Sequence, residues 1–284
     1  MFVYNKLTWY KKLLIRILIY GLIMVGALLV SIPFLWMIST ALKPIEDIFV
    51  FPPKFIPSRF IWSNFIVALT EYPFGLYLRN TLLITSTSTL GILLSCSLVA
   101  FSFARLNWPG RDLLFIAALA TMMLPEQVTM IPTFILFRYL GWVNTFLPLI
   151  IPPWFARQPF YVFLLRQFFM TIPVELDEAA KIDGAGYLDI FLRIILPIAK
   201  PALGIVAILF FQFKWDEFMA PLIYLHDSEL FTLALGLRAF SSEYGTQWNL
   251  MMAASCVFML PLILTYYFAQ RYYVQGIVFT GLKG

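Results

Sequence analysis

The sequence predicts an all-α polytopic membrane protein with six transmembrane helices and both termini in the cytoplasm. Of the 284 residues, 61% are hydrophobic and only 12% are charged, and the mean hydropathy is +0.85, which is not the composition of an ordinary soluble domain. Apolar stretches of roughly 20 residues recur along the chain, each long enough to cross about 30 Å of hydrocarbon as a helix. Most lysines and arginines of the connections fall on one side of these stretches, as expected for loops that stay in the cytoplasm.

The composition also limits the classes of function. The formal net charge of +5 is explained by basic residues that flank the spans, so no nucleic-acid partner is expected. Cys96 and Cys256 lie in apolar stretches, and His226 is the single histidine, so neither a disulfide framework nor a metal site is predicted. No glycine–lysine nucleotide loop occurs in the sequence. We therefore expect a protein that is not an enzyme, has no cofactor, and depends on a partner for any ATP hydrolysis.

The amino-terminal half is expected to hold three spans. Residues 1–16 are basic and aromatic and suit the cytoplasmic membrane surface, and the first span is too long for a signal-peptide core, which predicts an uncleaved anchor. The connection at residues 43–77 is polar and contains prolines, so it is placed outside. The third span contains Pro125, Glu126 and Pro132, which predict a kinked or interrupted helix.

The carboxyl-terminal half is expected to hold three more spans, with an outer loop at residues 224–248 and an inner tail. Residues 1–284 are interpreted as a single transmembrane domain with a core bundle at about 77–269. A polar segment, residues 171–200, separates the fourth and fifth spans and must be exposed to water because it carries many charges. The six spans are expected at residues 13–35, 80–103, 113–137, 147–169, 198–223 and 249–269.

The polar segment has the pattern of two short helices joined by a turn. Acidic residues at its start favour a helix amino terminus, and Gly184 and Gly186 are expected to end that helix, since glycine adopts the left-handed conformation without a steric clash. Apolar residues at helical spacing predict a second helix at residues 187–195. Pro197 and Pro201 are expected to stop this second helix.

These residues resemble a family motif. Glu178-Ala179-Ala180, with Gly184 following, and then Leu196-Pro197 and Lys200-Pro201, are similar to the EAA loop of the membrane subunits of binding-protein-dependent ABC importers. The similarity is greatest to the carbohydrate-uptake permeases, of the type represented by the second permease of the maltose importer, which have the type I importer fold. It implies that the loop is a coupling helix that docks on a cytoplasmic ATPase; a merely solvated loop is the alternative. The implied coupling residues are Glu178, Ala179, Ala180, Asp183 and Gly184.

A second group of candidate residues lies in the middle of the fourth span. Residues 152–159 contain three prolines and one arginine. An arginine at the bilayer centre is unfavourable by about 2.5–3.5 kcal/mol, so it should face protein or water, and irregular backbone at this depth requires a protein-lined cavity. We expect a substrate pathway in which Trp154 and Phe155 stack on a sugar and Arg157 and Gln158 bind its hydroxyl groups. The alternative is a structural Arg157 that pairs with backbone carbonyls or acidic side chains.

A third group lies in the outer part of the fifth span. Lys214 and Glu217 are three residues apart and can pair on one helix face. Trp215, Asp216 and Glu217 are added to the candidate substrate pathway. Members of the family commonly have Trp-Asn at the position of Trp215-Asp216, so a role for Asp216 does not carry over directly. It is expected either to bind substrate or to neutralise Arg157.

The resemblance implies a permease subunit that moves a sugar or small glycoside across the bacterial inner membrane by alternating access. The implied partners are a second, homologous permease in a heterodimer, two ATPase subunits and an extracytoplasmic substrate-binding protein, with membrane lipid around them. The tail also resembles that of the family, which implies a contact of Lys283 with the ATPase. The alternative cargo is glycerol 3-phosphate or a related phosphorylated polyol. An intramembrane enzyme using Glu126 and Asp216, and an inactive membrane scaffold, are the competing classes of function.

Overall fold

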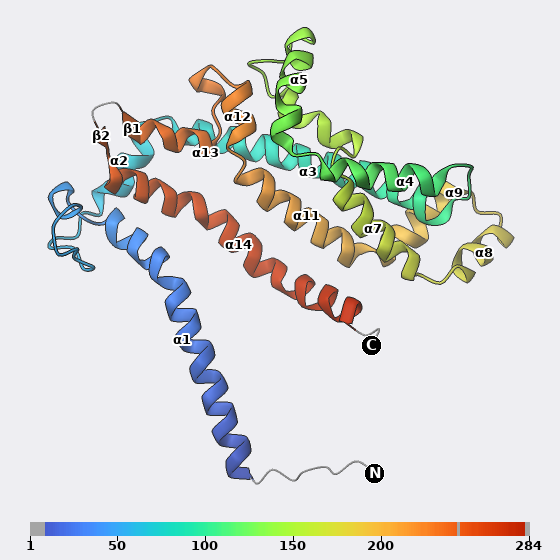
Figure 1. The fold of residues 1–284 in the computed structure, drawn as a ribbon, viewed down its shortest axis with the longest axis horizontal. Helices are drawn as coiled ribbons and strands as arrows, with labels where there is room; N and C mark the ends of the chain where they lie inside the picture. Colours follow the sequence, from blue (N-terminus) through green and yellow to red (C-terminus); the bar gives the residue numbers. More distant parts are fainter. Residues whose placement is uncertain (1–8, 243–244, 282–284) are drawn as a thin grey trace. The chain divides into compact units, whose positions relative to one another are not determined.

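The chain folds almost entirely into helices, as the sequence predicts (Figure 1). The computed structural model describes residues 9–242 and 245–281. Two short strands, β1 (Ser241–Ser242) and β2 (Gly245–Thr246), pair in antiparallel register. The α-helices are α1 (Trp9–Ala41), α2 (Ser63–Thr70), α3 (Phe74–Arg105), α4 (Arg111–Ala120), α5 (Glu126–Tyr139), α6 (Leu147–Ile150), α7 (Pro159–Thr171), α8 (Glu175–Ile182), α9 (Tyr187–Asp189), α10 (Leu196–Ile198), α11 (Lys200–Trp215), α12 (Met219–Tyr224), α13 (Leu233–Gly236) and α14 (Trp248–Gly281).

Three helical stretches are long and apolar enough to cross a membrane alone: Leu13–Ala41, Phe74–Arg105 and Trp248–Phe268. They correspond to the predicted first, second and sixth spans. The predicted third span is Arg111–Met123 followed by Glu126–Tyr139, bent by 100°. Pro125 lies at this break and caps the second helix with extended backbone, so the predicted interruption is confirmed.

The fifth and fourth spans are also broken. Tyr187–Ile198 and Lys200–Trp215 form a second pair, bent by 76°. Pro201 lies in the first turn of α11, where a missing N–H has no penalty, so it begins a helix and does not stop one as expected. The predicted fourth span consists of α6, a 3-10 turn at Pro152–Phe155 and α7. The described residues thus contain three to five candidate spans by length and composition, and the predicted count of six stays a prediction.

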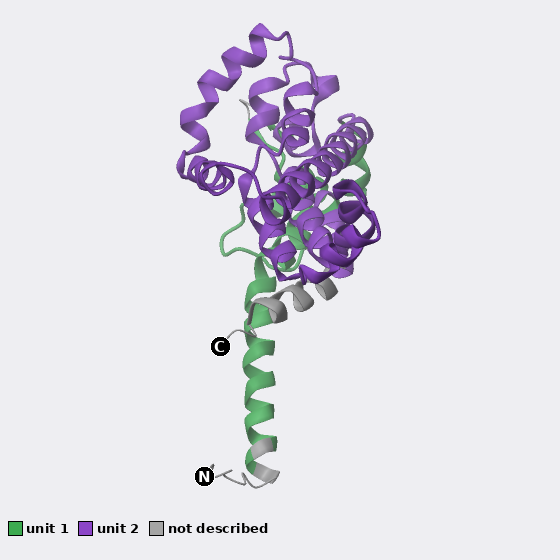
Figure 2. Cartoon of the chain, turned by 90° about the vertical axis from the view of Figure 1, so that its right-hand side faces the viewer, with its two compact units in different colours: residues 1–71, 240–257 green, residues 72–239, 258–284 purple. Residues whose placement is uncertain are grey.

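The chain divides into two compact units (Figure 2). Unit 1 comprises residues 1–71 and 240–257, and unit 2 comprises residues 72–239 and 258–284. Whether they act as the predicted single domain stays a prediction.

Side-chain hydrogen bonds fold the connection that follows α1 in unit 1. Asn64 donates to the carbonyl oxygens of Ala41 and Lys43, at 2.9 and 3.0 Å. The hydroxyl and the backbone N–H of Ser58 both donate to Asp47. These bonds, with Lys54 3.6 Å away, hold the pKa of Asp47 below its usual value. The polar connection is therefore an ordered structure.

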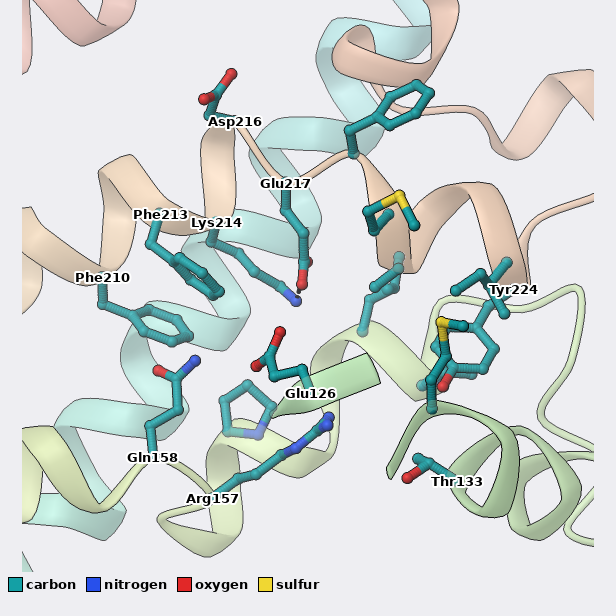
Figure 3. Close-up of a pocket in the computed structure, with 18 of the residues that line it drawn as sticks. Glu126, Thr133, Arg157, Gln158, Phe210, Phe213, Lys214, Asp216, Glu217 and Tyr224 are labelled. Carbon is teal, nitrogen blue, oxygen red and sulfur yellow. Dashed lines mark hydrogen bonds and ion pairs between the residues drawn. The ribbon is translucent and has the colours of Figure 1, made fainter. Parts of the chain in front are cut away.

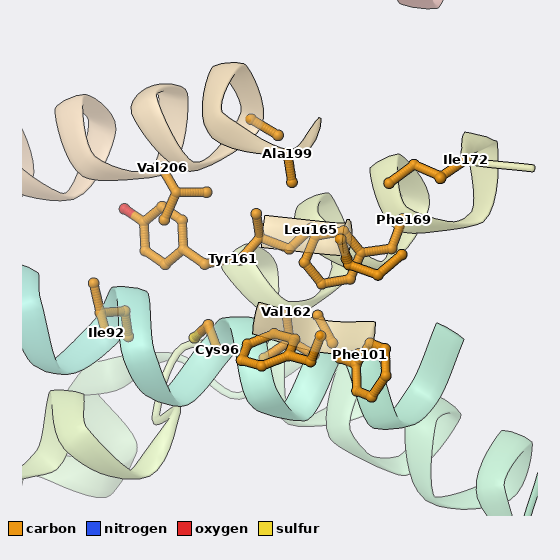
Figure 4. Packing of buried hydrophobic residues seen from close by; sticks show 14 of the residues in the cluster. Ile92, Cys96, Phe101, Tyr161, Val162, Leu165, Phe169, Ile172, Ala199 and Val206 are labelled. Carbon is orange, nitrogen blue, oxygen red and sulfur yellow. The ribbon is translucent and has the colours of Figure 1, made fainter. Parts of the chain in front are cut away.

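The core of unit 2 is built around α3. Its buried residues Ile92, Cys96 and Phe101 pack against α7 and against the start of α11 (Figure 4). α7 contributes Leu165 and Phe169, both with no exposed surface. Thr85, Ser88, Gly91 and Ala100 are also buried on α3, and such small residues let helices approach closely.

One close approach on α3 is at Gly91. A Cβ atom added there would lie 2.5 Å from the ring of Trp154, a separation that Cβ atoms essentially never show. The indole therefore occupies the space that glycine leaves free, and it fixes the 3-10 turn Pro152–Phe155 against α3.

Replacement of Gly91 should consequently destabilise the protein. We expect Gly91→Ala to reduce the free energy of unfolding by about 1–3 kcal/mol, because the methyl group must displace the indole ring that packs against this buried position. Thermal unfolding of the purified protein in detergent measures this effect. Gly75→Ala is the matched control, since nothing lies within 4 Å of that position on the same helix. Equal unfolding midpoints for the two variants would contradict the packing described.

Candidate functional site

The helix α8 of the polar segment ends in the turn that the sequence predicts. Gly184 has a φ of +84°, its N–H donates to the carbonyl of Lys181, and the N–H of Ala185 donates to the carbonyl of Ala180. This pair of bonds is the Schellman motif, which requires a left-handed residue at the position of Gly184. Gly186 differs from expectation, since its backbone is extended and it precedes α9.

The predicted coupling residues divide between two faces of α8. Glu178, Ala179, Asp183 and Gly184 are exposed, whereas Ala180 packs against the core. Large apolar side chains adjoin the exposed residues: Ile182 is 87% exposed, and Tyr187 and Leu188 are more than half exposed. Apolar surface beside charged residues is typical of a protein interaction site. Lys283 lies outside the described residues.

Unit 2 also contains a cavity of about 440 Å³. It is bounded by α5, by the segment between α6 and α7, and by α11 and α12 (Figure 3). Four of the predicted pathway residues line it: Arg157, Gln158, Asp216 and Glu217. The other lining residues include Glu126, Gln127, Met130, Thr133, Lys214 and Tyr224. Sequence reasoning noted Glu126 and Lys214 but missed the α5 residues that follow Glu126, although their place beside the Pro125 break was a usable signal.

Three predicted pathway residues do not line the cavity. Trp154 packs against Gly91, and Phe155 is 79% exposed away from it. Trp215 is buried, stacks on Phe211 and Phe258 at centroid distances of 5.5 and 6.0 Å, and donates from Nε1 to the carbonyl of Phe258. The structure thus brings the polar members of the predicted set together and leaves the aromatic members apart from them.

Irregular backbone presents Arg157 and Gln158 to the cavity. Ala156, just before them, has a left-handed φ of +50°. The hydroxyl of Ser95 on α3 donates to the carbonyl of Pro153 at 2.8 Å and accepts from the N–H of Ala156 at 3.1 Å. Backbone groups that the prolines leave outside a helix are thereby satisfied, as they must be away from water.

Opposite charges meet in this cavity. The Nζ atom of Lys214 lies 2.5 Å from Oε2 of Glu217, and the two side chains are 7% and 18% exposed, which confirms the predicted pair. Glu126 and Arg157 also line the cavity, and in Figure 3 the side chain of Asp216 is directed away from Arg157. The Oε1 atom of Gln158 is buried and has no hydrogen-bond partner. The lining therefore includes more carboxylates than cations, and the buried oxygen of Gln158 beside them has no partner.

Comparisons with known proteins agree on one family. Residues 88–278 match the family described as binding-protein-dependent transport system inner membrane component. A probable ABC transporter permease protein of Pyrococcus horikoshii is 34% identical, covering 87% of this chain and 90% of that protein. The arabinooligosaccharides transport system permease protein AraQ of Halalkalibacterium halodurans is 35% identical, over 81% and 82%. The sn-glycerol-3-phosphate transport system permease protein UgpE of Yersinia enterocolitica is 31% identical, over 90% and 94%.

The fold has a counterpart among solved structures. A chain of a bacterial ABC transporter involved in the import of the acidic polysaccharide alginate superimposes with a TM-score of 0.82 at 22% identity, covering 95% of this chain and all of that one. A second alginate transporter structure, in complex with an oligosaccharide-bound periplasmic protein, gives a TM-score of 0.63 at 15% identity, over 92% of both chains. The likeness at these identities confirms the predicted permease fold.

The ion pair of Lys214 and Glu217 predicts that removing one charge destabilises the protein more than removing both. Lys214→Met leaves Glu217 as a poorly hydrated, unpaired charge, so we expect it to lower the free energy of unfolding by roughly 3 kcal/mol. The double variant Lys214→Met/Glu217→Leu should recover most of this loss, because it removes both charges. Arg193→Gln is the control, since the Arg193–Asp189 pair has side chains 80% and 47% exposed and should contribute less than about 1 kcal/mol. Thermal unfolding midpoints test all three, and a double variant no more stable than Lys214→Met would refute the explanation.

Proposed function

Because the chain belongs to the family of binding-protein-dependent transport system inner membrane components, we propose that it is the permease subunit of an ATP-driven importer for a sugar or small glycoside. It is a multi-pass membrane protein, and we place it in the bacterial inner membrane. The proposed partners are a second, homologous permease, two ATPase subunits and an extracytoplasmic binding protein. Each ATPase would dock on a polar segment such as the exposed face of α8, and the ATPases would supply the only enzyme activity of the complex.

The size of the cavity and the residues that line it are the basis for proposing a sugar as the cargo. Its volume of about 440 Å³ lies within the range of small-molecule sites, about 300–1,000 Å³. Gln158 supplies an acceptor without a partner, which suits a hydroxyl donor. Leaving a buried polar atom unpaired is unfavourable, so a bound sugar hydroxyl would stabilise the cavity as well as itself.

The charges of the cavity favour a neutral cargo over an anion. The relatives named for arabinooligosaccharides and for glycerol 3-phosphate differ in this respect, so similarity alone leaves both open. A phosphate group is bound by cations that are free to pair with it. Here Lys214 is paired with Glu217, and the lining holds two further carboxylates, Glu126 and Asp216, against one further cation, Arg157. A phosphorylated polyol is therefore the second candidate. The similarity to the glycerol 3-phosphate permease supports it, and the excess of carboxylates in the lining opposes it.

The proposed mechanism is alternating access. ATP binding would close the two ATPases and bring the docked α8 helices of the two permeases together, and the attached spans would then open the cavity outward to accept cargo from the binding protein. ATP hydrolysis would reverse the movement and release the cargo inside. In this mechanism Glu178, Ala179, Asp183 and Gly184 act at the ATPase contact, and Lys283 is proposed as a further contact.

The first test is the substrate panel. We expect a neutral oligosaccharide or glycoside to stimulate ATP hydrolysis by the complete complex in lipid with its binding protein, because the cavity is lined by polar groups that suit hydroxyls and by more carboxylates than cations. ATPase rates are measured with neutral oligosaccharides, glycosides and glycerol phosphates. Stimulation by phosphorylated polyols alone would contradict the sugar assignment, and stimulation by neither class would contradict the proposal as a whole.

The role of Gln158 gives a second test. Gln158→Leu keeps the size of the side chain but removes the acceptor, so import of the stimulating sugar should fall roughly 3- to 10-fold, as for the loss of one hydrogen bond. Uptake into proteoliposomes at equal amounts of complex measures the effect. Gln167→Leu is the matched control, because Gln167 is an exposed glutamine of α7 outside the cavity lining. Equal uptake by the two variants would remove Gln158 from the pathway.

A further inference from the structure

The side chain of Arg105, the last residue of α3, joins two segments that are far from it in the sequence. Its Nη2 atom donates to the carbonyl of Ile172 at 2.7 Å. Its Nε atom lies 3.5 Å from Oδ2 of Asp177, and the two side chains are 4% and 8% exposed. A charged pair removed from water to this degree requires close compensation, so its presence at this place calls for an explanation.

The two contacts lie on either side of the connection between α7 and α8. Ile172 caps the carboxyl end of α7 with extended backbone, and Asp177 lies in the first turn of α8. The chain between them is short and begins with Pro173. Within the described parts of the chain, the pair of Arg105 and Asp177 is the one ion pair that joins α8 to another helix. Arg105 therefore holds α8 and the end of α7 in a fixed relation to α3.

The contact with Asp177 is incompletely formed in this structure. Neither Nε of Arg105 nor Oδ1 of Asp177 has a hydrogen-bond partner, although both atoms are buried. A guanidinium and a carboxylate are most stable when two parallel N–H···O bonds join them. A small movement of α8 toward α3 would allow the missing hydrogen bonds between the two groups to form, whereas a movement away would leave two buried charges unpaired. The free energy of the pair thus depends steeply on the position of α8.

The middle of α3 contacts the irregular turn at residues 153–158, which borders the cavity. Ser95 bonds the backbone at Pro153 and Ala156, and Gly91 receives the ring of Trp154. Ser95 and Arg105 are ten positions apart, about 15 Å along a helix. A shift of α3 that begins at Arg105 would therefore reach the backbone that presents Arg157 and Gln158.

We propose that Arg105 is a positioning residue that couples α8 to the cavity. Its guanidinium group transmits a displacement of α8 to α3 through Asp177 and Ile172, and α3 carries that displacement to the turn at residues 153–158. This inference rests on the proposed docking of α8 on an ATPase. It assigns to the pair a function in energy coupling that an ordinary structural contact would not have.

Arg105→Lys and Asp177→Asn test the proposal in the complete complex, reconstituted in lipid with its ATPase subunits and binding protein. Lysine keeps the charge but lacks the planar fork through which separate nitrogens of Arg105 reach the carbonyl and the carboxylate, and asparagine keeps the shape but loses the charge. The measured quantity is the amount of cargo imported per ATP hydrolysed, with the panel compound that stimulates the wild-type complex most. Both variants should lower this ratio roughly 3- to 30-fold, a range typical of altered coupling between sites.

Arg111→Lys is the matched control, because Arg111 also bonds a carbonyl, that of Leu106, and a carboxylate, that of Asp112, but both lie on the same α3–α4 segment. A structural defect would reduce the amount of complex and leave cargo per ATP unchanged. An unchanged ratio in both test variants would overturn the proposal, as would failure of both to assemble while Arg111→Lys assembles. Glu178→Lys separates the two hypotheses: if it leaves stimulated ATP hydrolysis intact, the docking of α8 is wrong, whatever the result at Arg105.

Discussion

The structure depends on one constraint: backbone polar groups at membrane depth need partners within the protein. The chain between α6 and α7 cannot form the regular hydrogen bonds of an α-helix, because consecutive prolines and the left-handed Ala156 interrupt the helical backbone. α3 compensates with side chains. Ser88 donates to the carbonyl of Leu149 at 3.1 Å, and Ser95 serves the two backbone groups on either side of the turn. The small, hydroxyl-bearing face of α3 is thus the condition for a polar cavity in unit 2.

The same helix has a different character at its carboxyl end. In the middle of α3, neutral hydroxyl groups satisfy neutral backbone groups, and such contacts change little in energy with small movements. At Arg105 the contact is between buried charges, and an imperfect geometry there is far more unfavourable. A helix whose contacts at the cavity vary little in energy with position, and whose contact with α8 varies steeply, responds mainly to movements of α8. This difference follows from the chemistry of the groups.

Local features were predictable from the sequence, and contacts between distant residues were not. The Schellman turn at Gly184, the break at Pro125 and the pair of Lys214 and Glu217 each depend on residues within a few positions of one another. The contact of Arg105 with Ile172 spans 67 positions, and no pattern of residue types indicates it. Trp215 shows the same limit, because its sequence neighbours are polar while a distant ring, Phe258, covers its face. The local conformation of α8 was predictable from its motif, whereas the make-up of the cavity was less so, because residues from several separate segments assemble it.

The exposed apolar surfaces of the chain differ in what can cover them. None of the apolar window of Leu13–Ala41 is buried in the structure, and hydrocarbon can cover such a helix because it is apolar on all sides. Lipid cannot cover Ile182 in the same way, because Asp183 and Lys181 flank it and charged groups are strongly disfavoured in hydrocarbon. In water, by contrast, this apolar side chain stays uncovered, since 87% of it is exposed. A protein surface with an apolar pocket and a polar rim satisfies both kinds of residue, so the chemistry of α8 supports a protein partner on physical grounds that are independent of the family motif.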